Sequence, residues 1–248
     1  MTLDFENQRQ HMVDGQIRTS DVTNLGVLAA FQEVPREEFV ANEHLPLAYL
    51  DDDLAIAAGR SIMAPATLAK LVQAASVGAN DIVLDIGCGT GYSTAILSRL
   101  CNSVVAVEEN SDLAGIASTK LSELGFDNAV VVQSRMTQGC AGEGPFDVIF
   151  LGGSVDEVPS TILEQLKDGR RLVAVVGQGE FRRSQPLDKG WQQRFLASPF
   201  QLRCGRASRI CQGSRIPVLT PVATEGGCHL LQLGNFPPFL PWCDTRLI

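Results

Sequence analysis

The sequence is poor in aromatic, histidine and basic residues. Aromatic residues make up 6% of its 248 positions, there are three histidines, and 20 Lys and Arg stand against 28 Asp and Glu, for a net charge of −8. The histidines His11, His44 and His229 show no metal-ligand spacing, so we expect no metal site. Phosphate binding needs a basic face, and the negative charge therefore argues against a nucleic-acid partner.

Long apolar runs and paired cysteines are also missing. No apolar stretch approaches the roughly 20 residues of a membrane helix, and residues 1–16 are polar rather than signal-like. The seven cysteines form no C-x-x-C pair, which is typical of reduced thiols. We therefore expect a cytoplasmic protein with no membrane partner, and we take a monomer as the default.

A glycine-rich turn between two apolar segments is the most informative feature of the chain. Residues 82–86 have the pattern of a buried strand, and three glycines fall within residues 87–91. A second apolar segment, 104–107, ends on Glu108. Strand–turn–helix–strand units of this kind bind adenosine-type cofactors, because the glycines let the backbone approach the ligand and the acid accepts hydrogen bonds from a ribose diol.

The glycine spacing distinguishes between cofactors. A dinucleotide site needs G-x-G-x-x-G, whereas Gly87, Gly89 and Gly91 form G-x-G-x-G with Asp85 two residues earlier. This pattern resembles motif I of the S-adenosylmethionine (SAM) methyltransferases. The resemblance implies that the three glycines contact SAM, that Asp85 orients its amino end and that Glu108 binds its ribose. A glycine-rich turn in another doubly wound domain is the alternative.

Strand and helix patterns alternate around this motif. They predict an α/β fold with a doubly wound, mostly parallel sheet, a Rossmann-like methyltransferase fold. The expected strands lie near 82–86, 103–107, 129–133, 147–151 and 171–176, with helices near 91–100, 111–124 and 157–166. Upstream, the sequence predicts helices at 7–18 and 22–33 with Asp21 as N-cap of the second, a loop over 39–62 and a helix that starts at Pro65.

Residues 9–179 resemble the protein-L-isoaspartate O-methyltransferase family. The resemblance rests on segments 9–17, 34–40 and 48–51, on the glycine motif and on segments 146–149 and 159–172. It implies SAM-dependent methylation of the free carboxylate of L-isoaspartyl residues in damaged proteins, which is a protein-repair reaction. A carboxylate is already nucleophilic, so such an enzyme needs positioning and exclusion of water rather than a strong general base.

The chain departs from the family pattern at two places. The family carries Gly-x-Thr-Ile-Ser-x-Pro before the helix that leads to motif I, and its hydroxyls contact the substrate carboxylate. Here Ser61 keeps the first hydroxyl, and Met63 replaces the serine. Arg60 is either a bidentate carboxylate clamp or a solvated loop arginine. Residues 134–136 replace the family's Gly-Asp-Gly, so the acid that would hold the adenine amino group is missing.

The composition changes after Gly179. Residues 1–179 hold 11 Lys and Arg against 24 Asp and Glu, whereas residues 180–248 hold nine against four. Back-translation of this tail, read one nucleotide forward, permits an open frame that resembles the family's last strands. We hypothesise a frameshift near codon 180 and expect the C-terminal strands of the sheet to be lost. Reading the gene across the codons for residues 176–220 tests this hypothesis.

The sequence therefore divides into three segments. Residues 1–78 form a helical, substrate-side segment, residues 79–179 the SAM-binding core, and residues 180–248 an atypical, poorly ordered tail. The leading hypothesis is a protein-L-isoaspartate O-methyltransferase with isoaspartyl proteins or peptides as substrate. Two alternatives stay open: a SAM-dependent O-methyltransferase with a small carboxylate or phenolic acceptor, and a SAM-binding protein without turnover.

Overall fold

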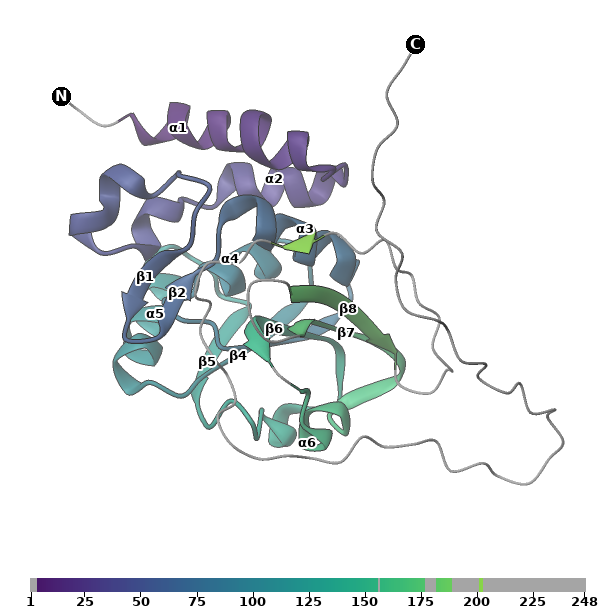
Figure 1. Cartoon of the computed structure of the whole chain (residues 1–248). Helices are drawn as coiled ribbons and strands as arrows, with labels where there is room; N and C mark the ends of the chain where they lie inside the picture. The colour runs from purple at the N-terminus through teal and green to yellow at the C-terminus, as the bar shows by residue number, and fades with distance from the viewer. Residues whose placement is uncertain (1–3, 156, 177–181, 189–200, 203–248) are drawn as a thin grey trace, which may run out of the picture. The chain divides into compact units, whose positions relative to one another are not determined.

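The computed structural model describes residues 4–155, 157–176, 182–188 and 201–202, which belong to one compact unit (Figure 1). Its α-helices are α1 (Phe5–Met12), α2 (Leu25–Glu33), α3 (Pro65–Ala75), α4 (Tyr92–Ser98), α5 (Ser111–Glu123) and α6 (Ser160–Leu163). Its strands are β1 (Leu54–Ala57), β2 (Arg60–Ile62), β3 (Ile82–Ile86), β4 (Ser103–Glu108), β5 (Ala129–Gln133), β6 (Phe146–Val155), β7 (Leu166–Val176), β8 (Arg182–Asp188) and β9 (Gln201–Leu202). Short 3₁₀ or π segments cover Val13–Ile17, Arg18–Ser20, Arg36–Phe39, Asn42–Leu47 and Ala141–Glu143.

The main sheet confirms the predicted fold class. Its strand order is β5-β4-β3-β6-β7-β8-β9, and the five strands from β5 to β7 are parallel. From the central strand β3 the chain winds outward through β4 and β5 on one side and through β6 and β7 on the other. In open α/β sheets, ligands bind beyond the carboxyl ends of the strands at this reversal point. The end of β3 is therefore where a site is expected.

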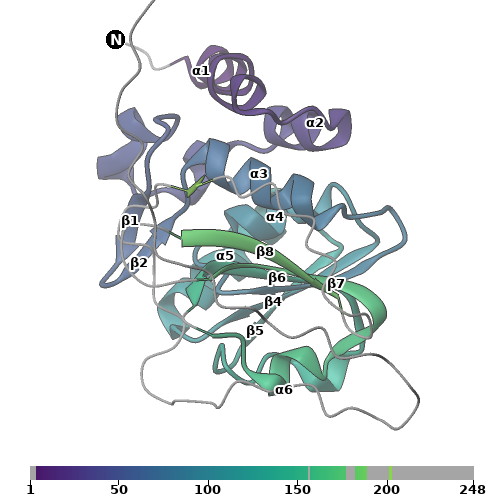
Figure 2. The same ribbon diagram turned by 45° about the vertical axis from the view of Figure 1, so that its right-hand side comes forward.

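Helices cover both faces of the sheet (Figure 2). Val83, Val104 and Val148 point to one face, where they share a buried core with α3, α4 and the N-terminal helices. Leu84 and Ile149 point to the other face, in a second core that includes Ile162 of α6. Since side chains alternate along a strand, the near-continuous apolar sequence of β3 and β6 follows from burial on both faces.

The N-terminal helices match the predicted segment but not its predicted cap. The side chain of Asn24 accepts a hydrogen bond from the backbone N–H of Val27 and caps α2. Asp21 instead has a left-handed backbone (φ 64°) at the end of the preceding helical segment. Asp21 and Asn24 are both good cap residues, and the predicted cap, Asp21, lies three positions before the observed cap, Asn24. The predicted start of α3 at Pro65 is confirmed.

Residues 39–62 are more structured than the predicted loop. They contain 3₁₀ turns and the antiparallel pair β1–β2, which forms a sheet of its own. Carboxylates of the acidic run 51–53 hold the end of this segment: Asp53 accepts from the Ala64 N–H at 2.8 Å and Asp51 from the Ala66 N–H at 3.0 Å. These acids sit at the first turn of α3, where its free N–H groups and dipole favour negative charge.

The C-terminal region corrects one part of the fold prediction. Two strands, β8 and β9, lie beyond residue 180, and β8 pairs antiparallel with β7 from Arg171↔Asp188 to Val176↔Arg183. The edge of β7 offers backbone donors and acceptors that an extended segment of almost any sequence can pair with. Most of the tail, including the 203–248 segment, lies outside the described residues, and the frameshift hypothesis stays a prediction. The structure holds no helix, within its described part, that is long and apolar enough to cross a membrane.

Candidate functional site

The glycine turn follows β3 directly, at the reversal point of the sheet. Gly87, Gly89 and Gly91 all have positive φ, at 82°, 60° and 100°. The N–H of Gly87 donates to the Val107 carbonyl at 2.7 Å, which ties the turn to β4. A Cβ on Gly91 would lie 3.3 Å from the Cβ of Ala117, so α4 and α5 approach each other closely here. The backbone conformation therefore explains why this turn needs glycine.

Asp85 lies under the turn, on the face of β3 that packs against α4. It is fully buried, and its Oδ2 accepts hydrogen bonds from the hydroxyls of Ser93 (2.8 Å) and Thr94 (2.7 Å). Its Oδ1 has no partner among the described residues. Desolvation raises the pKa of Asp85 to about 6, although the two hydroxyl hydrogen bonds lower it. An unpaired buried carboxylate oxygen fits the ammonium group of SAM.

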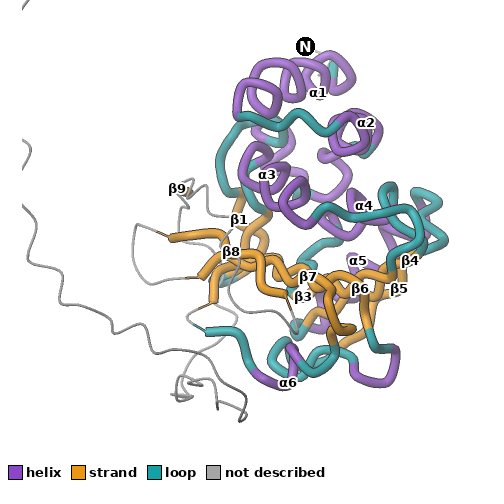
Figure 3. Tube along the Cα trace, turned by 90° about the vertical axis from the view of Figure 1, so that its right-hand side faces the viewer, coloured by secondary structure: helices purple, strands orange, loops and turns teal. Residues whose placement is uncertain are grey.

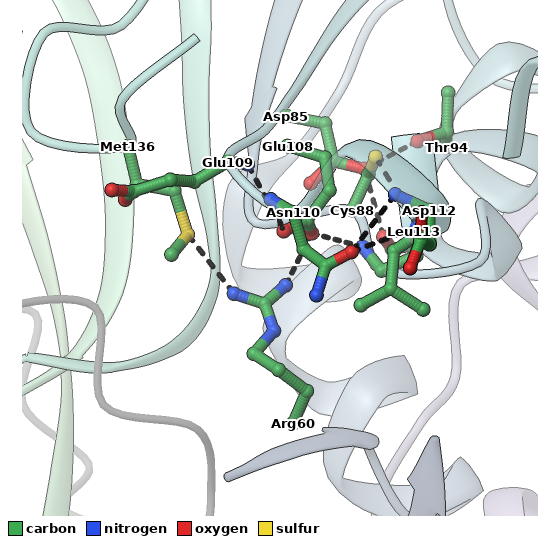
Figure 4. A network of polar contacts seen from close by, with 12 residues as sticks. Arg60, Asp85, Cys88, Thr94, Glu108, Glu109, Asn110, Asp112, Leu113 and Met136 are labelled. Carbon is green, nitrogen blue, oxygen red and sulfur yellow. Dashed lines mark hydrogen bonds and ion pairs between the residues drawn. The ribbon is translucent and has the colours of Figure 1, made fainter. Parts of the chain in front are cut away.

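Glu108 ends β4 and is also fully buried. Its Oε1 accepts from the backbone N–H groups of Glu109 (3.0 Å) and Asn110 (3.1 Å), and its Oε2 accepts from Gly89 N–H at 2.9 Å. Arg60 of β2 forms an ion pair with the same Oε2 (Figure 4). The structure thus brings Arg60, which the sequence left open as a carboxylate clamp or a solvated loop arginine, against the acid expected to bind ribose.

A narrow cavity joins the glycine turn to the segment before α3. Ser61 and Met63 line it together with Gly87, Gly89 and other residues of both segments. The hydroxyl-bearing segment and the predicted cofactor turn are therefore neighbours in space, although about 26 residues separate them in the sequence. Met63 is 9% exposed, so the residue that replaces the family's serine is buried at the cavity wall.

Two further cavity residues were not singled out from the sequence. Ile56 of β1 lies over the turn, and a Cβ on Gly89 would come within 2.8 Å of its Cδ1. Gly152 of β6 also lines the cavity, and a Cβ there would lie 2.8 Å from the Gly87 carbonyl oxygen. A glycine in the strand that neighbours motif I could have been noticed as a mark of close backbone approach.

We expect Gly152→Ala to lower the free energy of unfolding by about 2 kcal/mol, because the new methyl group would force the backbone of the glycine turn to move. Urea unfolding measures the loss. Gly115→Ala is the matched control: Gly115 is exposed in α5, and its Cβ would meet nothing within 4 Å. The control should gain up to about 1 kcal/mol from helix propensity. Equal effects of the two changes would contradict the close approach.

The remaining candidate groups within the described part of the chain are possible metal ligands and cysteine thiols. No cluster of three or more possible metal ligands occurs there. Cys88, Cys101 and Cys140 are free thiols, and burial raises the pKa of Cys88 and, to about 12, that of Cys101. The thiols of Cys88 and Cys101 are therefore protonated and poor nucleophiles at neutral pH.

The chain is similar to a set of known proteins that share one name. The family model of protein-L-isoaspartate (D-aspartate) O-methyltransferase matches residues 7–198. The protein-L-isoaspartate O-methyltransferase of Koribacter versatilis is 36% identical over 178 residues, which are 72% of this chain and 80% of that protein. That of Opitutus terrae is 38% identical over 174 residues, or 69% and 73% of the two chains.

Two solved structures have a similar fold. A protein-L-isoaspartate O-methyltransferase superimposes with a TM-score of 0.65 at 29% identity, over 73% of this chain and 60% of that one. A Plasmodium falciparum structure described as a complex with S-adenosyl-L-homocysteine (SAH) has a TM-score of 0.64 at 17% identity, over 76% of this chain and 91% of that one, and supports the fold alone.

The parallel sheet, the glycine turn at its reversal point and the two buried acids define a SAM-dependent methyltransferase. Within that class the chain belongs to the protein-L-isoaspartate O-methyltransferase family, because the family model covers more than half of its length. The predicted family, enzyme class and cofactor are confirmed at this level. The roles of single residues, the three-segment division and the monomeric state stay predictions.

Proposed function

We propose that this chain transfers a methyl group from SAM to the free carboxylate of L-isoaspartyl residues in proteins or peptides. The observation that carries the proposal is the cavity in which Ser61 and Met63 meet Gly87 and Gly89. An acceptor held by the segment before α3 would lie directly beside a cofactor held by the glycine turn. Family membership supplies the acceptor class, since the curated relatives are named for isoaspartate.

In such a site the described residues have separate roles in binding the cofactor and the acceptor. SAM, when bound, supplies an electrophilic methyl group on a sulfonium. Asp85 offers its free Oδ1 to an ammonium group, and Glu108 offers its carboxylate to ribose hydroxyls. The Ser61 hydroxyl donates a hydrogen bond to the acceptor carboxylate, and Arg60 is a second candidate for that contact. Because the acceptor is already an anion, these residues act by positioning it and by excluding water.

A methylation assay with the full chain tests the proposal. An isoaspartyl peptide should be converted to its methyl ester in the presence of SAM, and the same peptide with normal aspartate should not. The ester is read as methanol released by mild base. Methylation of neither peptide by a chain that binds SAH would favour the alternative of cofactor binding without turnover and would overturn the proposal.

We expect Met63→Ser to raise the rate on an isoaspartyl peptide about tenfold, because it restores a hydroxyl that can donate to the acceptor, and one hydrogen bond to a charged group contributes roughly 1.5 kcal/mol or more. Steady-state kinetics would show the gain in kcat/KM. The side chain of Met63 is nearly buried, so the same change should also lower the melting temperature.

Met63→Leu is the matched control, since it keeps an apolar side chain of similar volume and adds no hydroxyl. Its rate should stay near that of the unchanged chain. A rate for Met63→Ser no higher than that of the control would favour the second candidate function, methylation of a different carboxylate acceptor. That candidate rests on Met63 and on residues 134–136, where the chain departs from the family pattern.

A further inference from the structure

The Arg60 guanidinium is buried and poorly satisfied. Its side chain is 10% exposed, and among the described residues it makes one charge-assisted contact, to Glu108. Its Nη1 lies 3.0 Å from the Met136 thioether sulfur, which is a weak acceptor, and its Nε has no partner among the described residues (Figure 4). A guanidinium offers five N–H donors in a fork suited to a carboxylate, and the described residues use less than half of that capacity.

Glu108 does not depend on Arg60 for its own hydrogen bonds. Three backbone N–H groups, of Gly89, Glu109 and Asn110, donate to its two oxygens at 2.9–3.1 Å. These donors come from the turn and from the chain after β4, so they would stay in place if the arginine moved away. Glu108 can therefore lose Arg60 without becoming a buried, unpaired charge, whereas Arg60 needs a new anion.

The segment that carries Arg60 also limits the room at the turn. The β1–β2 pair is a separate two-stranded sheet with no ladder to the main sheet, and the tube view in Figure 3 draws the strands of both sheets in orange. Ile56 of β1 sits over Gly89, and the cavity between them has a volume of about 20 Å³. A space of that size holds about one water molecule. A nucleoside does not fit in this space, so a cofactor that contacts Gly89 here requires the pair to move outward, and Arg60 of β2 with it.

We propose that Arg60 exchanges carboxylates during binding: it pairs with Glu108 in the closed arrangement, leaves when ribose hydroxyls take its place, and then binds the carboxylate of the methyl acceptor. This inference rests on the proposed function and extends it to an order of binding, cofactor before acceptor. The exchange moves one cation between two anions and needs no proton transfer. Arg60 is then a residue that selects anionic acceptors and prevents their binding ahead of the cofactor.

The proposed exchange predicts that one variant binds SAH more tightly and the acceptor peptide more weakly. Arg60→Gln removes the competitor for Glu108, so the full chain should bind SAH about tenfold more tightly, because the closed arrangement no longer reduces the binding-competent fraction. In the presence of SAH, the same variant should bind an isoaspartyl peptide at least about tenfold more weakly, because the cation for its carboxylate is gone. Isothermal titration calorimetry measures both affinities.

Two further variants keep the test decisive. Arg18→Gln removes an arginine that is about half exposed and pairs with Asp14 on the surface, and it should change neither affinity. Arg60→Lys keeps the charge but not the planar fork, so in the presence of SAH it should bind the peptide more weakly than the unchanged chain does. The peptide affinity of Arg60→Lys also tests the exchange if Arg60→Gln does not fold.

The outcome for SAH decides the inference independently of activity. Equal or weaker SAH binding by Arg60→Gln, relative to the unchanged chain, would overturn the exchange, as would peptide binding by the unchanged chain that is equally tight with and without SAH. Failure of the unchanged chain to methylate an isoaspartyl peptide would overturn the proposed function instead. Tighter SAH binding by the variant would still support release of Glu108 in that case.

Discussion

Arg36→Met should lower the free energy of unfolding by about 4 kcal/mol, because it would leave two buried carbonyl groups without a donor, at roughly 1–3 kcal/mol each, and remove a packed side chain. Arg36 is fully buried. Its Nε donates to the Ala48 carbonyl at 2.7 Å and its Nη2 to the Met63 carbonyl at 2.9 Å. Its guanidinium also lies over the Tyr92 ring, 4.8 Å from the centroid. Urea unfolding measures the loss.

Arg99→Met is the matched control for this change. Arg99 also lies over an aromatic ring, 4.5 Å from the Phe126 centroid, but its side chain is 35% exposed and its ion pair with Glu33 lies at the surface. Exposed pairs contribute roughly 0–1 kcal/mol, so the control should lose much less stability. Similar losses in the two variants would show that ring stacking, and not the two buried carbonyls, accounts for the effect of Arg36.

The position of Arg36 also matters for the site. It bonds to the chain at residues 48 and 63, which bracket the segment that carries Arg60 and Ser61. Hydrogen bonds from one side chain to both ends of this segment hold the two ends in fixed positions relative to each other. We therefore infer that Arg36 is a positioning residue for the acceptor side. A stable replacement at this position should raise KM for the acceptor more than it raises the dissociation constant of SAH.

The sequence was sufficient to predict the parallel strands and the glycine turn. Residues 82–86, 129–133 and 171–176 were placed correctly as strands because apolar runs bounded by turns mark buried parallel strands. The glycine positions follow from local geometry, since positive φ at Gly87 and Gly91 selects glycine directly. Signals of this kind act within a few residues, and a single sequence records them.

The contacts between distant segments could not be predicted in the same way. The pairing of Arg60 with Glu108 joins residues 48 positions apart, and that of Arg36 with Met63 joins residues 27 apart. Either arginine could have been solvated in a loop, because no periodic pattern marks its partner. The short β1–β2 pair was missed for a similar reason: strands of four and three residues carry too little alternation to be recognised. The segment before α3 is therefore less predictable than the glycine turn.

Asp85→Asn should stabilise the fold and weaken cofactor binding at the same time. Burial raises the pKa of Asp85 from its usual value of 3.8 to about 6. A carboxyl group with a raised pKa stabilises the folded state below its unfolded pKa and loses that contribution as the pH rises through the folded pKa. At pH 7 the ionised group therefore costs roughly 2–3 kcal/mol, from a shift of about two units at 1.36 kcal/mol each. Asparagine removes this cost and still accepts from Ser93 and Thr94.

The gain in stability of Asp85→Asn should depend on pH. Urea unfolding at pH 7 should show the variant to be more stable by up to about 2 kcal/mol, and the difference should shrink as the pH falls from 6 toward 4. Thr94→Val is a matched control, because it removes a hydroxyl donor from the ionised carboxylate without removing the charge. The control should lose stability at pH 7. A variant Asp85→Asn that is less stable than the unchanged chain at pH 7 would show that the carboxylate is stabilised rather than strained.

SAH binding by the same variant tests whether the buried charge of Asp85 serves to bind the cofactor. Asp85→Asn should bind SAH about 100-fold more weakly at pH 7, because the ammonium group of the ligand loses its anion, a change of about 2.8 kcal/mol at 1.4 kcal/mol per factor of ten. In the unchanged chain the affinity should fall about tenfold per pH unit below 6, as Asp85 takes up a proton, and the variant should lack this dependence. Calorimetry between pH 5 and 8 resolves both. If the SAH affinity of both proteins depends on pH in the same way, the titrating group is not Asp85. If only the unchanged chain shows the dependence, the chain keeps an unfavourable buried charge because that charge binds the cofactor.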